Sequence, residues 1–160
     1  MFAYYMVESI SFATCIHKQG LLKQLFFGCT SSDAVYKKII ELGKELLPYP
    51  AEHKSAEKIV SGCQSLMYLH SYLEGDVLCF RAHSDALISA GLAALLIQIY
   101  EGELPEVVLQ CPPSCIEELG LAGLLSLSRA QGLSSFFLKM KRDALAFLQV
   151  RKILNNRPLS

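Results

Sequence analysis

The feature that most constrains this chain is a run of fifteen almost wholly apolar residues from Ala86 to Tyr100. Only Ser89 and Gln98 interrupt the run with polar side chains, so a helix over it is hydrophobic on nearly every face. A helix needs about 20 apolar residues to cross a bilayer, and this run is shorter. The run therefore predicts a helix at the centre of a folded domain, covered by other elements on all sides.

Helical spacing also predicts two helices before that run. The first begins at Lys18 and places a stripe of leucine and phenylalanine on one face. The second is capped by Ser31 or Ser32 and stopped by Pro48 and Pro50. Both have one apolar face, as expected for helices that pack against a core.

Between these helices and the apolar run, the spacing changes from helical to alternating, which predicts a small antiparallel sheet. Its strands are expected over residues 58–60, 66–73 and 77–82. The sequence Glu74-Gly75-Asp76 supplies the turn between the last two strands. About three strands are therefore expected, with one face of the sheet lying on a layer of helices.

After the sheet, Ser84 and Asp85 are expected to cap the central helix. Pro105 suits the first turn of a short helix, and Ser128 can cap a last amphipathic helix. Helices, a small sheet and more helices in this order predict an α+β fold.

The composition fits a single domain. The chain has 160 residues, of which 52% are hydrophobic and 19% charged. We expect the domain to span residues 18–152, with 1–17 as a loosely attached N-terminal extension and 153–160 as a C-terminal tail. Fifteen basic and fifteen acidic residues cancel, which argues against a nucleic-acid or membrane partner bound through net positive charge. The first basic residue is Lys18, so the charged start of a secretory signal is missing, and we expect a cytoplasmic protein.

The six cysteines are the residues that say most about function. None forms a Cys-x2-Cys pair, so the usual zinc-ribbon pattern is missing, and free thiols fit a reducing compartment. Cys63 lies between two expected strands in Ser61-Gly62-Cys63-Gln64-Ser65, where Gly62 permits backbone angles that other residues avoid. Such a loop can present a reactive thiol or pack a small apolar side chain beneath a turn, and the residues alone leave both open.

Two metal sites and one catalytic arrangement are conceivable from the remaining residues. Cys111 and Cys115 are four residues apart and could supply two metal ligands, although no second pair follows. Cys63, Cys79 and His83 form a second conceivable ligand set. A cysteine hydrolase is the third alternative, but no histidine lies in a recognisable signature.

Four blocks of this sequence, taken in order, resemble the SufE family of sulfur acceptors. They are Ile39-Ile40-Glu41-Leu42-Gly43, Val60-Ser61-Gly62-Cys63-Gln64-Ser65, Ser84-Asp85-Ala86 before the apolar helix with Gly91, and Leu125-Ser126-Leu127-Ser128-Arg129-Ala130-Gln131-Gly132-Leu133. The resemblance covers roughly residues 21–148. It implies a SufE/IscU-like fold, in which a small antiparallel sheet packs against several α-helices.

The resemblance implies a sulfur carrier that is neither hydrolytic nor a stand-alone enzyme. Proteins of this family take persulfide sulfur from a SufS/CsdA-type cysteine desulfurase, stimulate that enzyme, and pass the sulfur to an iron–sulfur scaffold complex of the SufBCD type. Pyridoxal phosphate belongs to the desulfurase, so the implied chain holds no cofactor or metal, only a transient persulfide. Carried onto this sequence, the acceptor is Cys63, whose thiolate takes the sulfur by thiol exchange.

The resemblance also implies roles for the residues around the acceptor. Support of the loop is expected from Gly62, Gln64, Ser65 and Asp85. Asp85 is expected to hold the loop through hydrogen bonds. Arg129 and Gly132 are expected to contribute to the partner surface.

Three positions depart from the family pattern: Tyr68 replaces a tryptophan, Leu127 a proline, and His83 a glycine or acidic residue. One hypothesis is that the His83 imidazole tunes the pKa of the thiol. An exposed persulfide is lost to reductants, so we expect Cys63 to be partly covered and its loop to move when a partner binds. The alternative function is an iron–sulfur scaffold that uses Cys63 with other cysteine or histidine ligands.

Overall fold

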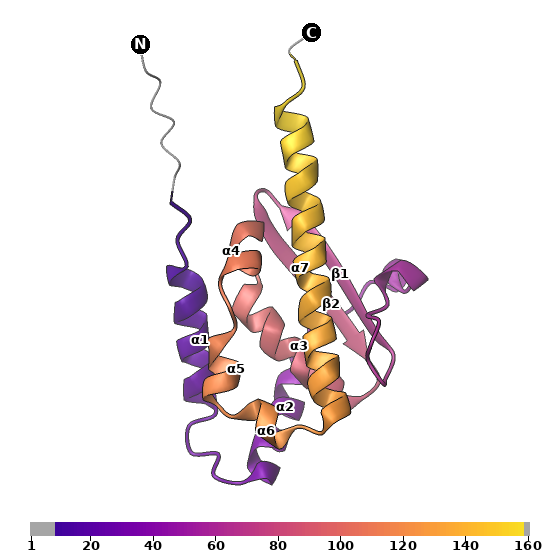
Figure 1. Cartoon of the computed structure of the whole chain (residues 1–160). Coiled ribbons are helices and arrows are strands. Elements are labelled where there is room, and N and C mark those ends of the chain that lie inside the picture. The colour runs from indigo at the N-terminus through magenta and orange to yellow at the C-terminus, as the bar shows by residue number, and fades with distance from the viewer. Residues whose placement is uncertain (1–8, 159–160) are drawn as a thin grey trace.

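The computed structural model describes residues 9–158, which form seven α-helices, two single-turn 3-10 helices and one two-stranded antiparallel sheet (Figure 1). In chain order the elements are α1 (Ala13–Leu25), α2 (Ser32–Lys44), η1 (Ala51–His53), η2 (Ala56–Lys58), β1 (Met67–Glu74), β2 (Val77–Ser84), α3 (Leu87–Tyr100), α4 (Pro105–Gln110), α5 (Ser114–Glu118), α6 (Leu121–Leu124) and α7 (Leu127–Asn155). The expected α+β class is confirmed. Helix α7 runs the length of the molecule, and its last turns extend past the other elements into the segment expected to be a tail.

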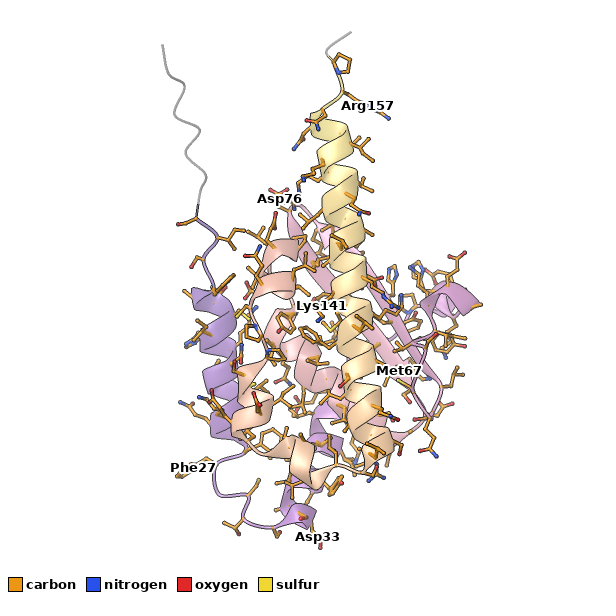
Figure 2. All side chains as sticks on the ribbon, viewed as in Figure 1. Phe27, Asp33, Met67, Asp76, Lys141 and Arg157 are labelled. Carbon is orange, nitrogen blue, oxygen red and sulfur yellow. The ribbon has the colours of Figure 1, made fainter. Side chains whose placement is uncertain are left out.

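Helix α3 lies at the centre, as its apolar sequence predicts. Every residue from Ala90 to Leu96 is buried, and the helix contacts α1, α2, α7 and β2. Helix α2 crosses α3 closely because two glycines meet there. A Cβ on Gly43 would lie 2.7 Å from the amide nitrogen of Gly91, and a Cβ on Gly91 would collide with the carbonyl oxygen of Ile39. Side chains fill the space between α3, α7 and the sheet (Figure 2).

In the part of the chain that the structure describes, no helix is both long enough and apolar enough to cross a membrane.

The sheet pairs β1 with β2 in antiparallel register, as the expected hairpin requires. The third expected strand, residues 58–60, is reduced to an isolated bridge between Ile59 and Tyr68, because the 3-10 helix η2 occupies the residues before it. Buried side chains alternate along β1, and the sheet packs against α3 and α7. The expected layer of helices on one face is therefore present.

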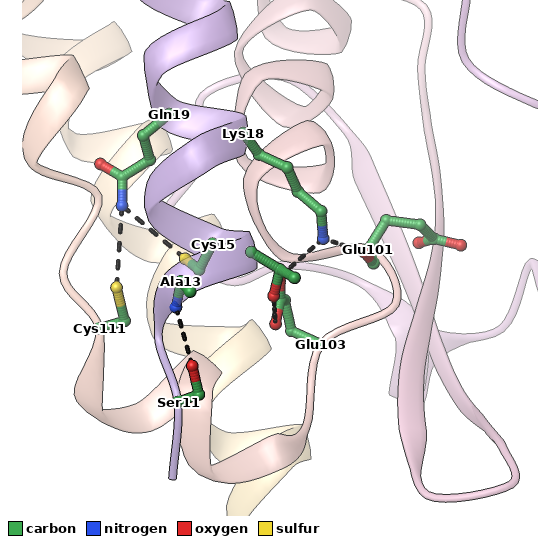
Figure 3. Close-up of polar contacts among 9 residues, drawn as sticks. Ser11, Ala13, Cys15, Lys18, Gln19, Glu101, Glu103 and Cys111 are labelled. Carbon is green, nitrogen blue, oxygen red and sulfur yellow. Dashed lines mark hydrogen bonds and ion pairs between the residues drawn. The ribbon is translucent and has the colours of Figure 1, made fainter.

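Helix α1 begins at Ala13 and not at Lys18, so part of the expected extension is helical. Its first turn lacks a clear apolar stripe, and a buried polar side chain, Gln19, anchors the helix (Figure 3). Nε2 of Gln19 donates to the carbonyl oxygen of Pro112 at 3.0 Å, and its Oε1 accepts from the amide of Cys115 at 3.0 Å. In the missed first turn, Thr14 donates to the carboxylate of Glu103 at 2.9 Å and Cys15 is buried, and contacts of this kind with distant segments leave no local periodicity.

A second anchor ties α1 to the chain after α3 (Figure 3). Nζ of Lys18 donates to the carbonyl oxygen of Glu101 at 2.6 Å and pairs with the buried carboxylate of Glu103 at 2.7 Å. Residues 13–17, which were expected to belong to a loosely attached extension, are therefore part of α1. Residues 1–8 of that expected extension lie outside the part of the chain that the structure describes.

Side-chain caps match the expectation for α2 but not for α3 and α7. Ser31 caps α2 as expected. Ser126, rather than Ser128, caps α7, so that helix begins earlier than expected. The N-cap residue of α3 is Ala86, whose methyl group cannot accept a hydrogen bond, and the hydroxyl of Ser84 accepts from the amide of Ala86 at 3.2 Å.

Stacked aromatic rings join the outer face of the sheet to the connection between α2 and β1. The imidazole of His53 stacks on that of His70 with ring centroids 3.6 Å apart, and His70 stacks on Tyr72 at 5.3 Å. Tyr49 lies against Tyr68 at 5.8 Å. This stack holds the chain in place just before the loop that follows η2.

The histidine stack predicts that the protein loses stability as the pH falls below about 6.5. Burial lowers the pKa of His70 from its ordinary 6.5, and the positive charges of His53 and Lys58 act in the same direction. Arg81 lowers the pKa further, and Asp143 opposes the shift. Below pH 6.5 the unfolded chain therefore binds more protons at this site than the folded chain, so the free energy of unfolding decreases.

Urea unfolding at neutral pH and about one unit below the ordinary histidine pKa measures this decrease. A His70→Gln variant should lose part of the pH dependence. An identical dependence in the variant would assign the loss of stability to other groups.

Candidate functional site

The thiol loop, defined as residues 61–66, joins η2 to β1 and lies against α7. Its ends are held together by a hydrogen bond from the amide of Val60 to the carbonyl oxygen of Met67 at 2.9 Å. Gly62 has φ of +90°, which side-chain-bearing residues rarely adopt. A Cβ on Gly62 would also collide with the hydroxyl of Ser135 on α7. The glycine thus permits both the turn and the close approach to α7.

A cavity of about 470 Å³ lies between the thiol loop, α3 and α7. The loop contributes Cys63, Gln64 and Ser65 to its wall, and α7 contributes Arg129 and Gly132. Apolar side chains and the first turn of α3 form most of the remaining wall. Five of the seven site residues expected from the sequence therefore line one cavity, although they come from segments far apart in the chain.

The side chain of Cys63 is half-buried, which confirms the expectation that the thiol is partly covered. Its Sγ donates a long hydrogen bond of 3.7 Å to the carbonyl oxygen of Gly132. Burial raises the pKa of the Cys63 thiol above its ordinary 9.0. The donor role also requires the proton, so the resting side chain is a thiol and not a thiolate.

Polar contacts attach the C-terminal side of the thiol loop to neighbouring elements. Ser65 and Ser89 share a hydrogen bond with 2.8 Å between their Oγ atoms. The hydroxyl of Ser84 donates to the carbonyl oxygen of Leu66 at 2.9 Å. Gln64 is exposed at the cavity wall. Sequence reasoning missed the role of Ser89, whose only signal was a polar side chain within an apolar helix.

Asp85 makes a different contact from the one expected. Its Oδ1 lies 3.2 Å from Nε2 of His83, and its side chain is 92% exposed. Among the described hydrogen bonds, the neighbouring Ser84, and not Asp85, binds the thiol loop. The reason is position, since Asp85 lies at the solvent-exposed junction of β2 and α3. Burial raises the pKa of Cys63, and among the described hydrogen bonds His83 binds Asp85 and not the thiol.

Arg129 lies in the first turn of α7 at the rim of the cavity. Its guanidinium carbon is 5.4 Å from the ring centroid of Tyr36, a cation–π contact that orients the side chain. The hydroxyl of Tyr36 donates to the carbonyl oxygen of Leu124 at 2.6 Å, which fixes the ring in turn. Among the described ion pairs none involves Arg129, so its charge can serve a partner.

Of the other five cysteines, Cys29 is half-buried like Cys63 but does not line the cavity. Four are buried in the core: Cys15, Cys79, Cys111 and Cys115. Burial raises the pKa of Cys15 to about 12 and the pKa values of Cys79 and Cys115 to about 11, so these thiols are inert at neutral pH. Within residues 9–158, no three histidine, cysteine, aspartate or glutamate side chains form a group that could hold a metal ion. In this part of the chain Cys63, Cys79 and His83 therefore do not form a ligand set, and Cys111 and Cys115 belong to no group of three such ligands.

Comparisons with known proteins identify relatives of this chain. The SufE family model, described as an Fe-S metabolism associated domain, matches residues 21–144. The chain is 34% identical over 116 residues to the sulfur acceptor protein CsdE of Escherichia coli, covering 71% of this chain and 79% of that protein. It is 31% identical over 141 residues to the cysteine desulfuration protein SufE of Wigglesworthia glossinidia brevipalpis, covering 87% and 97%. An uncharacterized SufE-like protein of Synechocystis is 38% identical over 112 residues, covering 70% of each chain.

A solved structure shares the fold. The solution structure of a hypothetical protein from Thermus thermophilus has a TM-score of 0.67 and covers 85% of this chain and 96% of that one. The two sequences are 23% identical, so this likeness concerns the fold alone. The matched family segment, residues 21–144, contains the thiol loop and the parts of α3 and α7 that line the cavity.

Proposed function

We propose that this chain, which belongs to the SufE family, accepts persulfide sulfur from a cysteine desulfurase on Cys63. Relatives named as sulfur acceptor and cysteine desulfuration proteins support a role in sulfur transfer for iron–sulfur metabolism. The assignment to Cys63 is supported by its place in the structure. Among the described residues, it is the cysteine in the wall of the cavity at which the expected site residues converge.

The proposed step is an exchange between a thiol and a persulfide. The thiolate of Cys63 attacks the outer sulfur of the persulfide on the desulfurase, and a new S–S bond forms on Cys63. The S–S bond of the donor breaks at the same time, and the donor cysteine leaves as a thiolate. Because the sulfane sulfur only changes its thiol partner, the step needs no external oxidant, reductant or cofactor on this chain.

Proton loss has to precede that attack. The pKa of the Cys63 thiol is raised by burial, so the thiol in its cavity is protonated at neutral pH. We propose that the thiol loop moves when the desulfurase docks, which brings Cys63 into a more polar environment where the thiolate forms. The proton passes to water or to a base of the partner.

The cavity supports a second part of the proposal, the protection of the acquired sulfur. A persulfide adds one sulfur atom to the side chain, and a cavity of about 470 Å³ has room for it. Its walls are mostly apolar, and a sulfur held there is shielded from soluble reductants between encounters. This arrangement favours a carrier that moves between two protein partners.

The surface around the cavity supports a protein partner. Leu87 lines the cavity with Arg129 and is 58% exposed, and Leu66 in the thiol loop and Leu127 in the first turn of α7 are exposed by 52% and 79%. Exposed apolar side chains next to a charged group are typical of protein–protein contact surfaces. We propose that the sulfur donor is a SufS/CsdA-type desulfurase, which this chain stimulates. The proposed recipient is a SufBCD-type scaffold complex, and the proposed compartment is the cytoplasm.

Intact mass measurement tests this function directly. The full chain is incubated with a cysteine desulfurase and cysteine, and the control omits cysteine. We expect a mass increase of whole sulfur atoms that a thiol reductant removes and that peptide analysis locates on Cys63. An unmodified chain beside an active desulfurase would contradict the proposal, and iron retained after anaerobic reconstitution would favour the scaffold alternative.

A further inference from the structure

Few polar contacts hold the tip of the thiol loop on the rest of the protein. Among the described hydrogen bonds, residues 61–65 make two to other elements. One runs from Sγ of Cys63 to the carbonyl oxygen of Gly132 at 3.7 Å, and the other joins Ser65 and Ser89 at 2.8 Å. A thiol is a weak donor, so the bond between the two hydroxyl groups is the stronger attachment of residues 61–65. The bond from Ser84 to the carbonyl oxygen of Leu66 holds the base of the loop, next to β1.

The two serines of this bond lie in different structural settings. Ser89 lies in the first turn of α3, the central helix, and Gly91 two residues later is in close contact with the backbone of Ile39 on α2. A shift of Ser89 would therefore disturb the packing of the core. Ser65 lies in a loop without regular structure, so it is the partner that moves away when the bond breaks.

We propose that Ser89 is a positioning residue that latches the thiol loop and so holds Cys63 inside its cavity. This inference rests on the proposed function, because a latch is useful only if Cys63 is an acceptor thiol that stays covered until a partner opens the loop. Both hydroxyl groups can bind water after the loop opens, so the net cost of breaking the bond is modest. Docking of another protein on the exposed rim of the cavity is sufficient to offset it.

The latch has a consequence for the reactivity of the thiol. In the closed loop, burial keeps the pKa of Cys63 above 9.0, and the thiol reacts slowly with an alkylating agent. In the open loop the thiol is in contact with water and its pKa approaches 9.0. The rate of alkylation therefore reports the fraction of molecules in which the loop is open.

Alkylation of the isolated full chain by iodoacetamide tests the latch. In Ser89→Ala we expect the rate at Cys63 to rise roughly fivefold at neutral pH, the change that corresponds to about 1 kcal/mol for one hydrogen bond. The midpoint of the pH profile should move down toward 9.0. Ser65→Ala should raise the alkylation rate at Cys63 by a similar factor. The double variant should react no faster than either single variant, because both changes break the same bond. Ser89→Thr keeps the hydroxyl and should keep the slow rate.

Controls separate a latch from a general loss of structure. Ser134 is an exposed serine of α7, and Ser134→Ala should leave the rate at Cys63 unchanged. Cys79 and Cys115 are buried and should stay unmodified in every variant. A rate and pH profile in the Ser89 and Ser65 variants equal to those of Ser134→Ala would overturn the latch, as would equal gains in reactivity at Cys79 and Cys115.

The measurement also keeps the latch separate from the proposed function. It uses no desulfurase, so an unchanged alkylation rate would remove the latch and leave sulfur acceptance by Cys63 standing. A chain that takes up no sulfur, but shows the expected alkylation profile, would remove the proposed function and leave the latch as a property of the loop.

Discussion

A Cys63→Ser variant is expected to fold like the natural chain and to take up no sulfur from a cysteine desulfurase. The serine hydroxyl is smaller than the thiol and fits the same space, and the hydrogen bond between Ser65 and Ser89 does not depend on the thiol, so the fold should be kept. A hydroxyl cannot form the S–S bond on which the exchange depends, so uptake should fall to background. Intact mass after incubation with the desulfurase and cysteine measures the uptake, and stimulation of the desulfurase should be lost with it.

Cys29 offers a matched control for this variant. It is a half-buried cysteine that does not line the cavity. Cys29→Ser should therefore take up sulfur like the natural chain, which excludes a general effect of removing a thiol. Full stimulation of the desulfurase by Cys63→Ser, or sulfur bound to that variant, would refute Cys63 as the acceptor.

A Gly91→Ala variant is expected to lose about 3 kcal/mol or more of its free energy of unfolding. The added methyl group would collide with the carbonyl oxygen and the side chain of Ile39, where α2 crosses α3. The carbonyl oxygen is a backbone atom, so rotation of a side chain cannot relieve the collision, and α2 and α3 have to move apart. Because α3 is the central element, that separation opens the core, and chemical denaturation measures the loss.

Two other glycines test whether the crossing is the cause. Gly20 lies in α1 with no atom within 4 Å of an added Cβ, so Gly20→Ala should be neutral or stabilise the helix by up to about 1 kcal/mol. Gly43→Ala meets the amide of Gly91 at 2.7 Å and should destabilise the protein like the Gly91 variant. A loss of stability in Gly20→Ala as large as in Gly91→Ala would contradict the crossing as its origin.

The elements with strong local signals could be predicted from the sequence. Apolar residues on every face of 86–100 predicted the buried helix α3, and the turn at 74–76 predicted the hairpin of β1 and β2. Each signal is contained within a few neighbouring residues, which a single sequence displays. The beginning of α1 could not be predicted in this way, because its first turn is held by contacts with distant residues, such as the hydrogen bond from Thr14 to Glu103.

The candidate site was only partly predictable for a related reason. The motif around Cys63 pointed to the thiol that is proposed as the acceptor, and four more of the expected residues line its cavity. The partner of Ser65 was not predictable, because Ser89 lies in a helix whose other residues follow a packing pattern. Asp85 lies beside the site as expected, but the exposed junction that it occupies pairs it with His83.

From its residues alone this protein could be placed in the α+β class and given a central helix, and the resemblance of its motifs to a known family pointed to Cys63 as the thiol proposed to accept sulfur. The arrangement that controls that thiol came from the tertiary structure: a cavity between three segments, a carbonyl oxygen at Gly132 and a hydroxyl at Ser89. Local sequence determines which segments become helices or strands. Contacts between distant segments depend on how closely the helices pack, and here the glycines at the α2–α3 crossing determine that distance.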